Sequence, residues 1–181
     1  MPAGPVRAGG AERPQPGLLI LVLGLGATLY AMFGLPVQTT DLNLGNSFYF
    51  GDIRHYSHPE PIARLAMGRL AAVWWNYLGL TLVALLVVLV AVTAAVPSVR
   101  AQTARAAAVL ALLVAALHTV ALAQTSELSQ LVITFRRTGS SFGAAGLGVW
   151  VTYAGLAVVI AGAVAVVLAD RSAGVVAAPA T

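Results

Sequence analysis

The sequence predicts an all-α membrane protein, a four-helix transmembrane bundle with a larger first extracytoplasmic loop. The first observation is composition: of 181 residues, 59% are hydrophobic and only 9% are charged, whereas soluble domains carry about 25% charged residues. The second is patterning, because the apolar residues gather into four runs separated by prolines and polar stretches. Each run reaches the roughly 20 helical residues that a hydrocarbon core of about 30 Å requires.

Composition also argues against several classes of function. The net charge of +4 comes from ten arginines and no lysine, a balance that suits membrane threading and lipid headgroups better than nucleic acid. The chain has no cysteine, which excludes disulfides, a thiolate nucleophile and cysteine-based metal sites. We therefore expect the lipid bilayer as a partner, and neither nucleic acid nor a cofactor.

Residues 1–16 are rich in proline and glycine and predict a disordered tail ahead of a four-helix domain at 17–171. The first span covers 17–36 and ends at a proline, which cannot continue a helix. Its basic flank resembles that of a signal peptide, but the apolar run is longer than usual there, so we expect the helix to be retained. Small residues at helical spacing give this span one narrow face: Gly24, Thr28 and Ala31.

Segment 37–70 is the predicted first outer loop. In its first half, aromatic and β-branched residues flank the turn-like Asn43-Leu-Gly45-Asn46, which predicts a short β-hairpin. In its second half, histidines and carboxylates recur at close spacing: Asp52, His55, His58 and Glu60. Such side chains can bind zinc or a similar divalent ion. The alternative is a polar loop that is solvated or contacts lipid headgroups, because neighbouring prolines break any helix that would align the histidines.

The second span covers 71–96 and ends before a proline. It opens with Trp74 and Trp75, and tryptophan favours the membrane interface, where its ring lies among lipids and its N–H reaches water. The third span, 104–123, carries a seam of small residues that includes His118. Small residues along one face let a neighbouring backbone come close.

The second outer loop covers 124–145. Apolar residues at i, i+3, i+4 and i+7 from Leu128 to Phe135 predict a helical face, which either extends the third helix or lies in the membrane interface. The adjacent Arg136 and Arg137 could bind anionic headgroups or a phosphate through their forked donors. The alternative is that they flank the fourth span without a ligand.

The fourth span covers 146–169, and a flexible tail follows at 172–181. Gly148, Gly155 and Gly162 recur every seven residues, which predicts a flat groove on one side of the helix. Glycine is tolerated in a membrane span where another helix presses against it. We therefore expect this face to be a helix-packing surface.

His118 lies in the middle of the third span, where ionisable residues are rare and often functional. One interpretation is a proton-relay group or a haem ligand, although no other span carries a central ionisable partner. The other is a neutral histidine that hydrogen-bonds to Thr28, Thr81 or a backbone carbonyl and so links two helices. We favour the second.

The stretch Gly146-Leu-Gly148-Val-Trp150-Val-Thr-Tyr-Ala-Gly155-Leu resembles the last helix of small, largely uncharacterised actinobacterial four-helix integral membrane proteins, as does the overall plan. The resemblance implies a four-helix fold and no activity. Four spans place both termini on one side. The arginines divide equally between the two sides, so we rely on the basic flank of the first span, which predicts cytoplasmic termini in the cell membrane.

Three functions follow as hypotheses. The first is a non-enzymatic accessory or scaffold subunit that binds a protein partner, or a second copy of itself, through the outer loop and the glycine-lined helix face. The second is a small transporter or permeation subunit, which needs a polar path such as His118, Asn76 and Gln124. The third is a metal-dependent or lipid-modifying enzyme that uses the loop from His55 to Glu60. We favour the first, because no catalytic constellation stands out.

Overall fold

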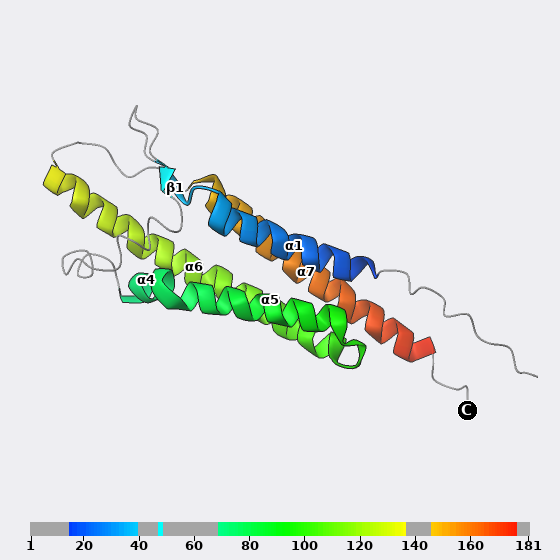
Figure 1. Cartoon of the computed structure of the whole chain (residues 1–181). Helices are drawn as coiled ribbons and strands as arrows, with labels where there is room; N and C mark the ends of the chain where they lie inside the picture. Colours follow the sequence, from blue (N-terminus) through cyan, green and yellow to red (C-terminus); the bar gives the residue numbers. More distant parts are fainter. Residues whose placement is uncertain (1–14, 40–46, 49–68, 137–145, 177–181) are drawn as a thin grey trace, which may run out of the picture.

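The computed structural model describes residues 15–39, 47–48, 69–136 and 146–176, and the observations below concern these residues. The helices in chain order are α1 (Pro16–Gly34), α4 (Arg69–Val73), the π-helical turn η1 (Trp74–Leu78), α5 (Gly79–Ala95), the 3-10 turn η2 (Pro97–Val99), α6 (Arg100–Arg136) and α7 (Leu147–Val176) (Figure 1). Among the described residues, four stretches are long and apolar enough to cross a membrane: Pro16–Gly34, Leu70–Ala95, Pro97–Gln124 and Leu147–Ser172.

The long helices pack in the order α1, α7, α6, α5, each chiefly against the next, while α1 meets α5 far less. The first and last of these helices in the chain, α1 and α7, are thus the most extensively packed pair. The start of α1, the turn η2 and the end of α7 lie at one end of the bundle, called here the terminal end (Figure 1). The strand β1, α4 and the start of α7 lie at the opposite end, called the loop end.

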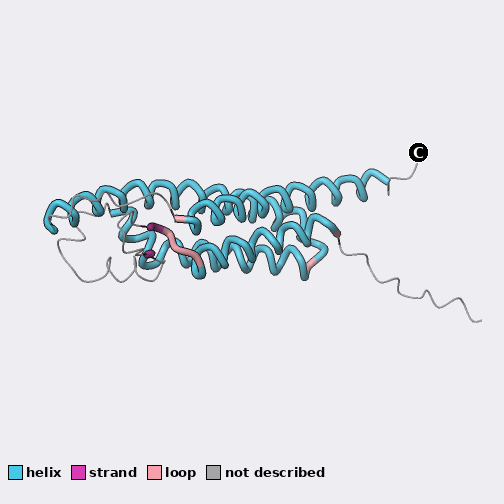
Figure 2. Tube along the Cα trace, turned by 90° about the horizontal axis from the view of Figure 1, so that it is seen from above, coloured by secondary structure: helices cyan, strands magenta, loops and turns pink. Residues whose placement is uncertain are grey.

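Two helices run beyond their predicted limits. α6 continues to Arg136, so residues 124–136 are an extension of the third helix and not a loop. No glycine or proline interrupts this stretch, and its apolar residues keep the helical spacing. The 37-residue helix is about 55 Å long at 1.5 Å per residue, and its last turns project past the other helices (Figure 2). α7 likewise continues to Val176, into the predicted tail.

A short connection joins α5 to α6 at the terminal end. Pro97 begins η2, and the hydroxyl of the fully buried Thr93 lies 2.8 Å from that of Thr103 across the turn. The Arg100 Nε atom donates to the Thr93 carbonyl oxygen at 3.2 Å. Because these contacts satisfy carbonyl and hydroxyl groups at the end of α5, the two helices are held as an antiparallel hairpin.

Large apolar side chains lie on the outer surface of the bundle as well as in its core. Leu21, Leu86 and Leu156 are buried between the helices. Leu23 on α1, Val109 on α6 and Leu168 on α7 point outward and are 61%, 67% and 56% exposed. An outer surface of this kind is typical of helices that are surrounded by hydrocarbon, and water does not favour it.

The strands β1 (Gln38–Thr39) and β2 (Ser47–Phe48) pair antiparallel at the loop end, with Gln38 opposite Phe48 and Thr39 opposite Ser47. The predicted hairpin falls on this region, and its connecting residues 40–46 lie outside the described part of the chain. β1 follows directly on Val37, whose side chain is buried. The first loop therefore leaves the bundle from a residue that packs in its core.

Candidate functional site

α1 fills the glycine groove of α7. A Cβ added to Gly155 would lie 2.5 Å from Thr28 Oγ1 and 2.7 Å from the Thr28 backbone nitrogen. On the facing helix, a Cβ added to Gly24 would lie 2.5 Å from the backbone nitrogen of Val159. Real side chains do not tolerate these distances, so glycine on both helices is what lets the two backbones touch.

This contact continues along both helices as a glycine seam, formed by Gly17 and Gly24 of α1 and by Gly148, Gly155 and Gly162 of α7. Its two buried threonines bond within their own helices. Thr28 Oγ1 donates to the Gly24 carbonyl oxygen at 2.9 Å, and Thr152 Oγ1 donates to that of Gly148 at 2.7 Å. The seam therefore buries hydroxyl groups without leaving their protons unpaired.

Both ends of the first loop are tied to the bundle by hydrogen bonds. Where the loop leaves α1, Gly146 N donates to the Val37 carbonyl oxygen at 2.8 Å and Gly148 N donates to that of Pro36 at 2.9 Å. Where the loop enters α4, the backbone N–H of Ala71 donates to Gln124 Oε1 at 2.9 Å. That N–H lies in the first described turn of α4.

The π-helical turn η1 positions a cluster of aromatic side chains. Gly79 N donates to the Trp74 carbonyl oxygen, five residues back instead of four. The three consecutive side chains of Trp74, Trp75 and Asn76 are all buried in this turn. In a regular α-helix, three successive side chains point in widely separated directions. A Cβ on Gly79 would lie 3.1 Å from Trp74 Cε2, so glycine lets the indole rest against the backbone. Such turns occur frequently at functional sites.

His118 of α6 lies among three rings of this cluster. Its ring centroid is 5.7 Å from that of Trp74, 5.7 Å from that of Trp75 and 5.8 Å from that of Tyr153 on α7. These separations are typical of packed aromatic pairs. The side chain is 2% exposed, and it contacts elements on both sides of α6.

The contacts of His118 differ from those expected. Its Nε2 atom has no hydrogen-bond partner among the residues that the structure describes. The hydroxyls of Thr28 and Thr81 donate instead to carbonyl oxygens four residues earlier in their own helices. The expected hydrogen bond from Thr28 or Thr81 to this nitrogen is therefore not present among the described residues.

The tryptophans also differ from expectation. Trp74 and Trp75 are completely buried, so their rings pack inside the protein and not among lipids. Trp74 Nε1 has no hydrogen-bond partner within the described part of the chain. The sequence signal was ambiguous, since aromatic residues at the entry of a span are equally typical of an interfacial belt and of a packed core.

A hydroxyl pair joins α6 to α7 beside the cluster. Thr119 Oγ1 donates to the Ala115 carbonyl oxygen at 2.8 Å and lies 2.7 Å from the Tyr153 hydroxyl. Because the threonine proton is used within α6, the tyrosine donates to the threonine oxygen. The cluster thus links three helices through rings and one inter-helix hydrogen bond.

Within the described part of the chain, this cluster includes none of the predicted metal ligands or headgroup-contacting arginines. Asp52, His55, His58 and Glu60 lie outside the described residues, as does Arg137. Within the described ranges no group of three or more metal-ligating side chains occurs. Arg136 is the last residue of α6, roughly 18 Å along the helix from Gln124 at 1.5 Å per residue.

Comparisons with protein-family models, with curated proteins and with solved structures found no match. The geometry of the helical bundle is therefore the basis of the functional argument. It brings together the glycine seam, the two anchored roots of the first loop and the ring cluster around His118.

Proposed function

We propose that this chain is a four-span integral membrane protein that acts as a non-enzymatic accessory or scaffold subunit. In this proposal the first outer loop binds a partner protein, and the helical bundle holds that loop in place. The observation that carries the proposal is the hydrogen bonding of both loop roots to different helices of one packed bundle. A binding segment is most effective when rigid elements support it.

Membrane insertion is supported by the outer surface of the four apolar stretches. Leu23, Val109 and Leu168 each expose more than half of their side chains, and hydrocarbon is the solvent that favours this. Cytoplasmic termini are supported by Arg7 and Arg13 ahead of the first span, because positive flanks remain inside. A periplasm-dependent reporter that is active when fused after the last residue would overturn this orientation.

The anchoring of the two roots supports a display role for the loop. On one side, Pro36 and Val37 are bonded through their carbonyl oxygens to the start of α7. On the other, Ala71 is bonded through its N–H to Gln124 of α6. Because α6 and α7 pack against each other, a partner that holds the loop is coupled directly to the helices.

The glycine-lined face of α7 has no part in partner binding in this proposal. α1 of the same chain already occupies it, with backbone atoms of Gly24 and Thr28 against Gly155. A partner helix could reach this face only by displacing α1. The partner is therefore assigned to the loop alone.

Affinity purification from its host in mild detergent tests the proposal. The wild-type chain is compared with a variant in which residues 49–60 are replaced by an equal length of Gly and Ser. We expect a stoichiometric partner with the wild type, its loss with the variant, and the same thermal unfolding midpoint for both. Val88→Ala on the lipid-facing side of α5, where Val88 is 55% exposed, is the matched control and retains the partner. A partner that stays bound to the loop variant contradicts the proposal.

A small transporter subunit is the second candidate. It is favoured by two buried polar atoms inside the bundle, Asn76 Oδ1 and His118 Nε2, which have no hydrogen-bond partner in the described residues. Ionisable side chains inside membrane spans, of which His118 would be one, are a feature of substrate and ion paths. Recovery of a homo-oligomer without any other protein in the same purification would favour this function over the scaffold, and bound metal would favour an enzyme of the first loop.

A further inference from the structure

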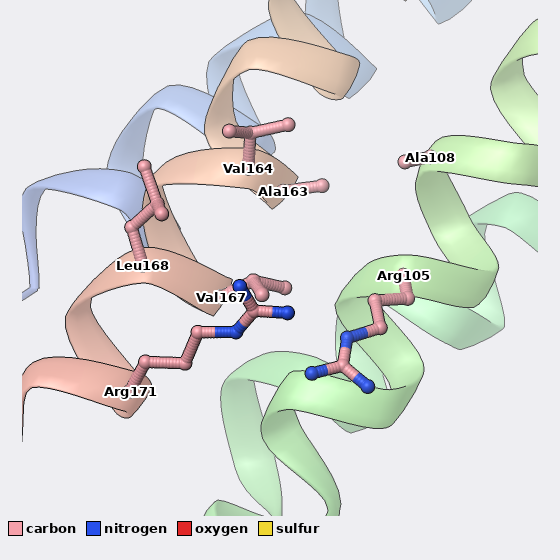
Figure 3. Close-up of a pocket in the computed structure, with 7 residues that line it drawn as sticks. All are labelled: Arg105, Ala108, Ala163, Val164, Val167, Leu168 and Arg171. Atoms are coloured by element: carbon pink, nitrogen blue, oxygen red, sulfur yellow. The ribbon is translucent and has the colours of Figure 1, made fainter. Parts of the chain in front are cut away.

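A cleft opens between α6 and α7 near the terminal end, far from the loop end. Its volume is about 290 Å³. It is lined by Arg105 and Ala108 of α6 and by Ala163, Val164, Val167, Leu168 and Arg171 of α7 (Figure 3). Ala108 and Ala163 point toward each other across the gap. The cleft thus exists because both helices carry alanine where larger side chains would close the space.

Two arginines stand at the mouth of this cleft. Figure 3 shows the guanidinium groups of Arg105 and Arg171 reaching toward each other from the two helices. Both side chains are exposed, and within the described ranges neither has an ion-pair or hydrogen-bond partner. Arg100, at the same end of the bundle, is different because its Nε atom donates to Thr93. Asp170 is exposed beside Arg171 and does not line the cleft.

We propose that this cleft binds an anionic glycerophospholipid. The phosphate lies between Arg105 and Arg171, and one acyl chain lies against the apolar wall of Val164, Val167 and Leu168. Guanidinium groups carry forked donors that match phosphate oxygens. The apolar wall lies directly next to the two arginines, so one amphiphilic molecule can contact both. A free phosphate would contact only the arginines.

The depth of the site fits this ligand. Arg171 is one residue from the end of the apolar stretch Leu147–Ser172, where lipid headgroups lie if that stretch spans the membrane. This inference rests on the membrane placement proposed above and does not require the partner protein. With the termini inside, the site faces the leaflet whose anionic lipids attract arginine.

The test places the full chain in nanodiscs of phosphatidylcholine that contain a small fraction of phosphatidylglycerol with the same acyl chains. Lipids that remain bound after transfer to detergent are counted by native mass spectrometry. We expect the wild type to retain phosphatidylglycerol over phosphatidylcholine on the order of tenfold. Joint Arg105→Gln and Arg171→Gln substitution abolishes the preference, and joint substitution by Lys retains part of it. Arg100→Gln removes one charge at the same end and leaves the preference unchanged.

A second variant tests the acyl-chain part of the site. Ala108→Leu fills the cleft without changing charge, and we expect it to lower the retained phosphatidylglycerol several-fold. The inference is overturned if the Gln variants retain the lipid as the wild type does, if Ala108→Leu has no effect, or if inorganic phosphate displaces the lipid completely. Failure of the wild type to enter nanodiscs of phosphatidylcholine alone would instead contradict the membrane placement.

Discussion

Gly155 of α7 and Gly24 of α1 meet backbone to backbone. A Cβ on Gly155 would lie 3.0 Å from the Gly24 carbonyl oxygen, and a Cβ on Gly24 would lie 2.9 Å from the Gly155 carbonyl oxygen. The relationship is reciprocal, so neither residue can gain a side chain without separating the helices. In the membrane placement proposed above, lipid gives no hydrophobic driving force between helices, so this close packing is what holds α1 on α7.

Gly155→Ala is therefore expected to destabilise the protein. The added methyl group must displace Thr28 or the whole of α1, and overpacking of this kind lowers the free energy of unfolding by about 1–3 kcal/mol. Reversible unfolding in detergent measures the change. The matched control is Gly26→Ala, because a Cβ at Gly26 meets nothing within 4 Å. The control should leave stability unchanged or raise it by up to about 1 kcal/mol, since alanine favours helix. Equal losses in the two variants would rule out the seam as the cause.

Substitutions of His118 test whether its ring stabilises the protein by packing. His118→Phe keeps a ring among Trp74, Trp75 and Tyr153, and we expect unfolding free energies within about 1.5 kcal/mol of wild type. His118→Ala leaves a cavity and should cost about 2–5 kcal/mol. Thermal unfolding of both variants checks this order. Wild-type stability in the Ala variant would show that the rings do not depend on the histidine for packing.

The hydroxyl pair between Thr119 and Tyr153 can be measured by a double-mutant cycle. Thr119→Val and Tyr153→Phe each remove one partner of the 2.7 Å contact. We expect a coupling energy of about 0.6 kcal/mol, the average for hydrogen bonds between helices in membranes. Because Thr119 is exposed, its single substitution should have little effect of its own. Strict additivity of the two substitutions would mean that the contact does not stabilise the α6–α7 pair.

Gln124→Met tests the anchor at the second root of the loop. Methionine keeps the length of the side chain and removes Oε1, which accepts the Ala71 N–H at 2.9 Å. A hydrogen bond of this kind contributes about 1 kcal/mol net, so amide exchange at Ala71 should be roughly fivefold faster. Gln102→Met, at an exposed position of the same helix, is the control and should leave that amide unchanged. An unaltered exchange rate in Gln124→Met would show that the backbone is held by other contacts.

The sequence predicts the four long helices well because each is a long apolar run that prolines and polar stretches separate from the next. It also predicts two packing faces, one around Gly24 and Thr28 and the other around Gly148 and Gly155. What it does not reveal is that these faces meet. The choice of helix partner depends on the three-dimensional order of the bundle, and small residues at helical spacing suit several neighbours equally well.

The ring cluster shows a second limit. The residue types of Trp74, Trp75 and His118 are visible in the sequence, but the π-helical turn that gathers them is not. A π turn forms where tertiary packing compensates for a poorer backbone hydrogen-bond pattern, and local propensity does not encode this. The extension of α6 was predictable only as one of two alternatives, because an amphipathic pattern fits a projecting helix and an interfacial one alike.

The glycine seam also imposes an order in time. Chains are synthesised from the N-terminus, so α1 emerges well before α7 exists. In the membrane placement proposed above, Gly17 and Gly24 of α1 have no helix to pack against until α7 is inserted. Assembly is complete only when the fourth span arrives, and every shortened product that lacks it exposes the same unpaired face. A chain without the fourth span therefore differs from the finished protein by an uncovered glycine face on α1.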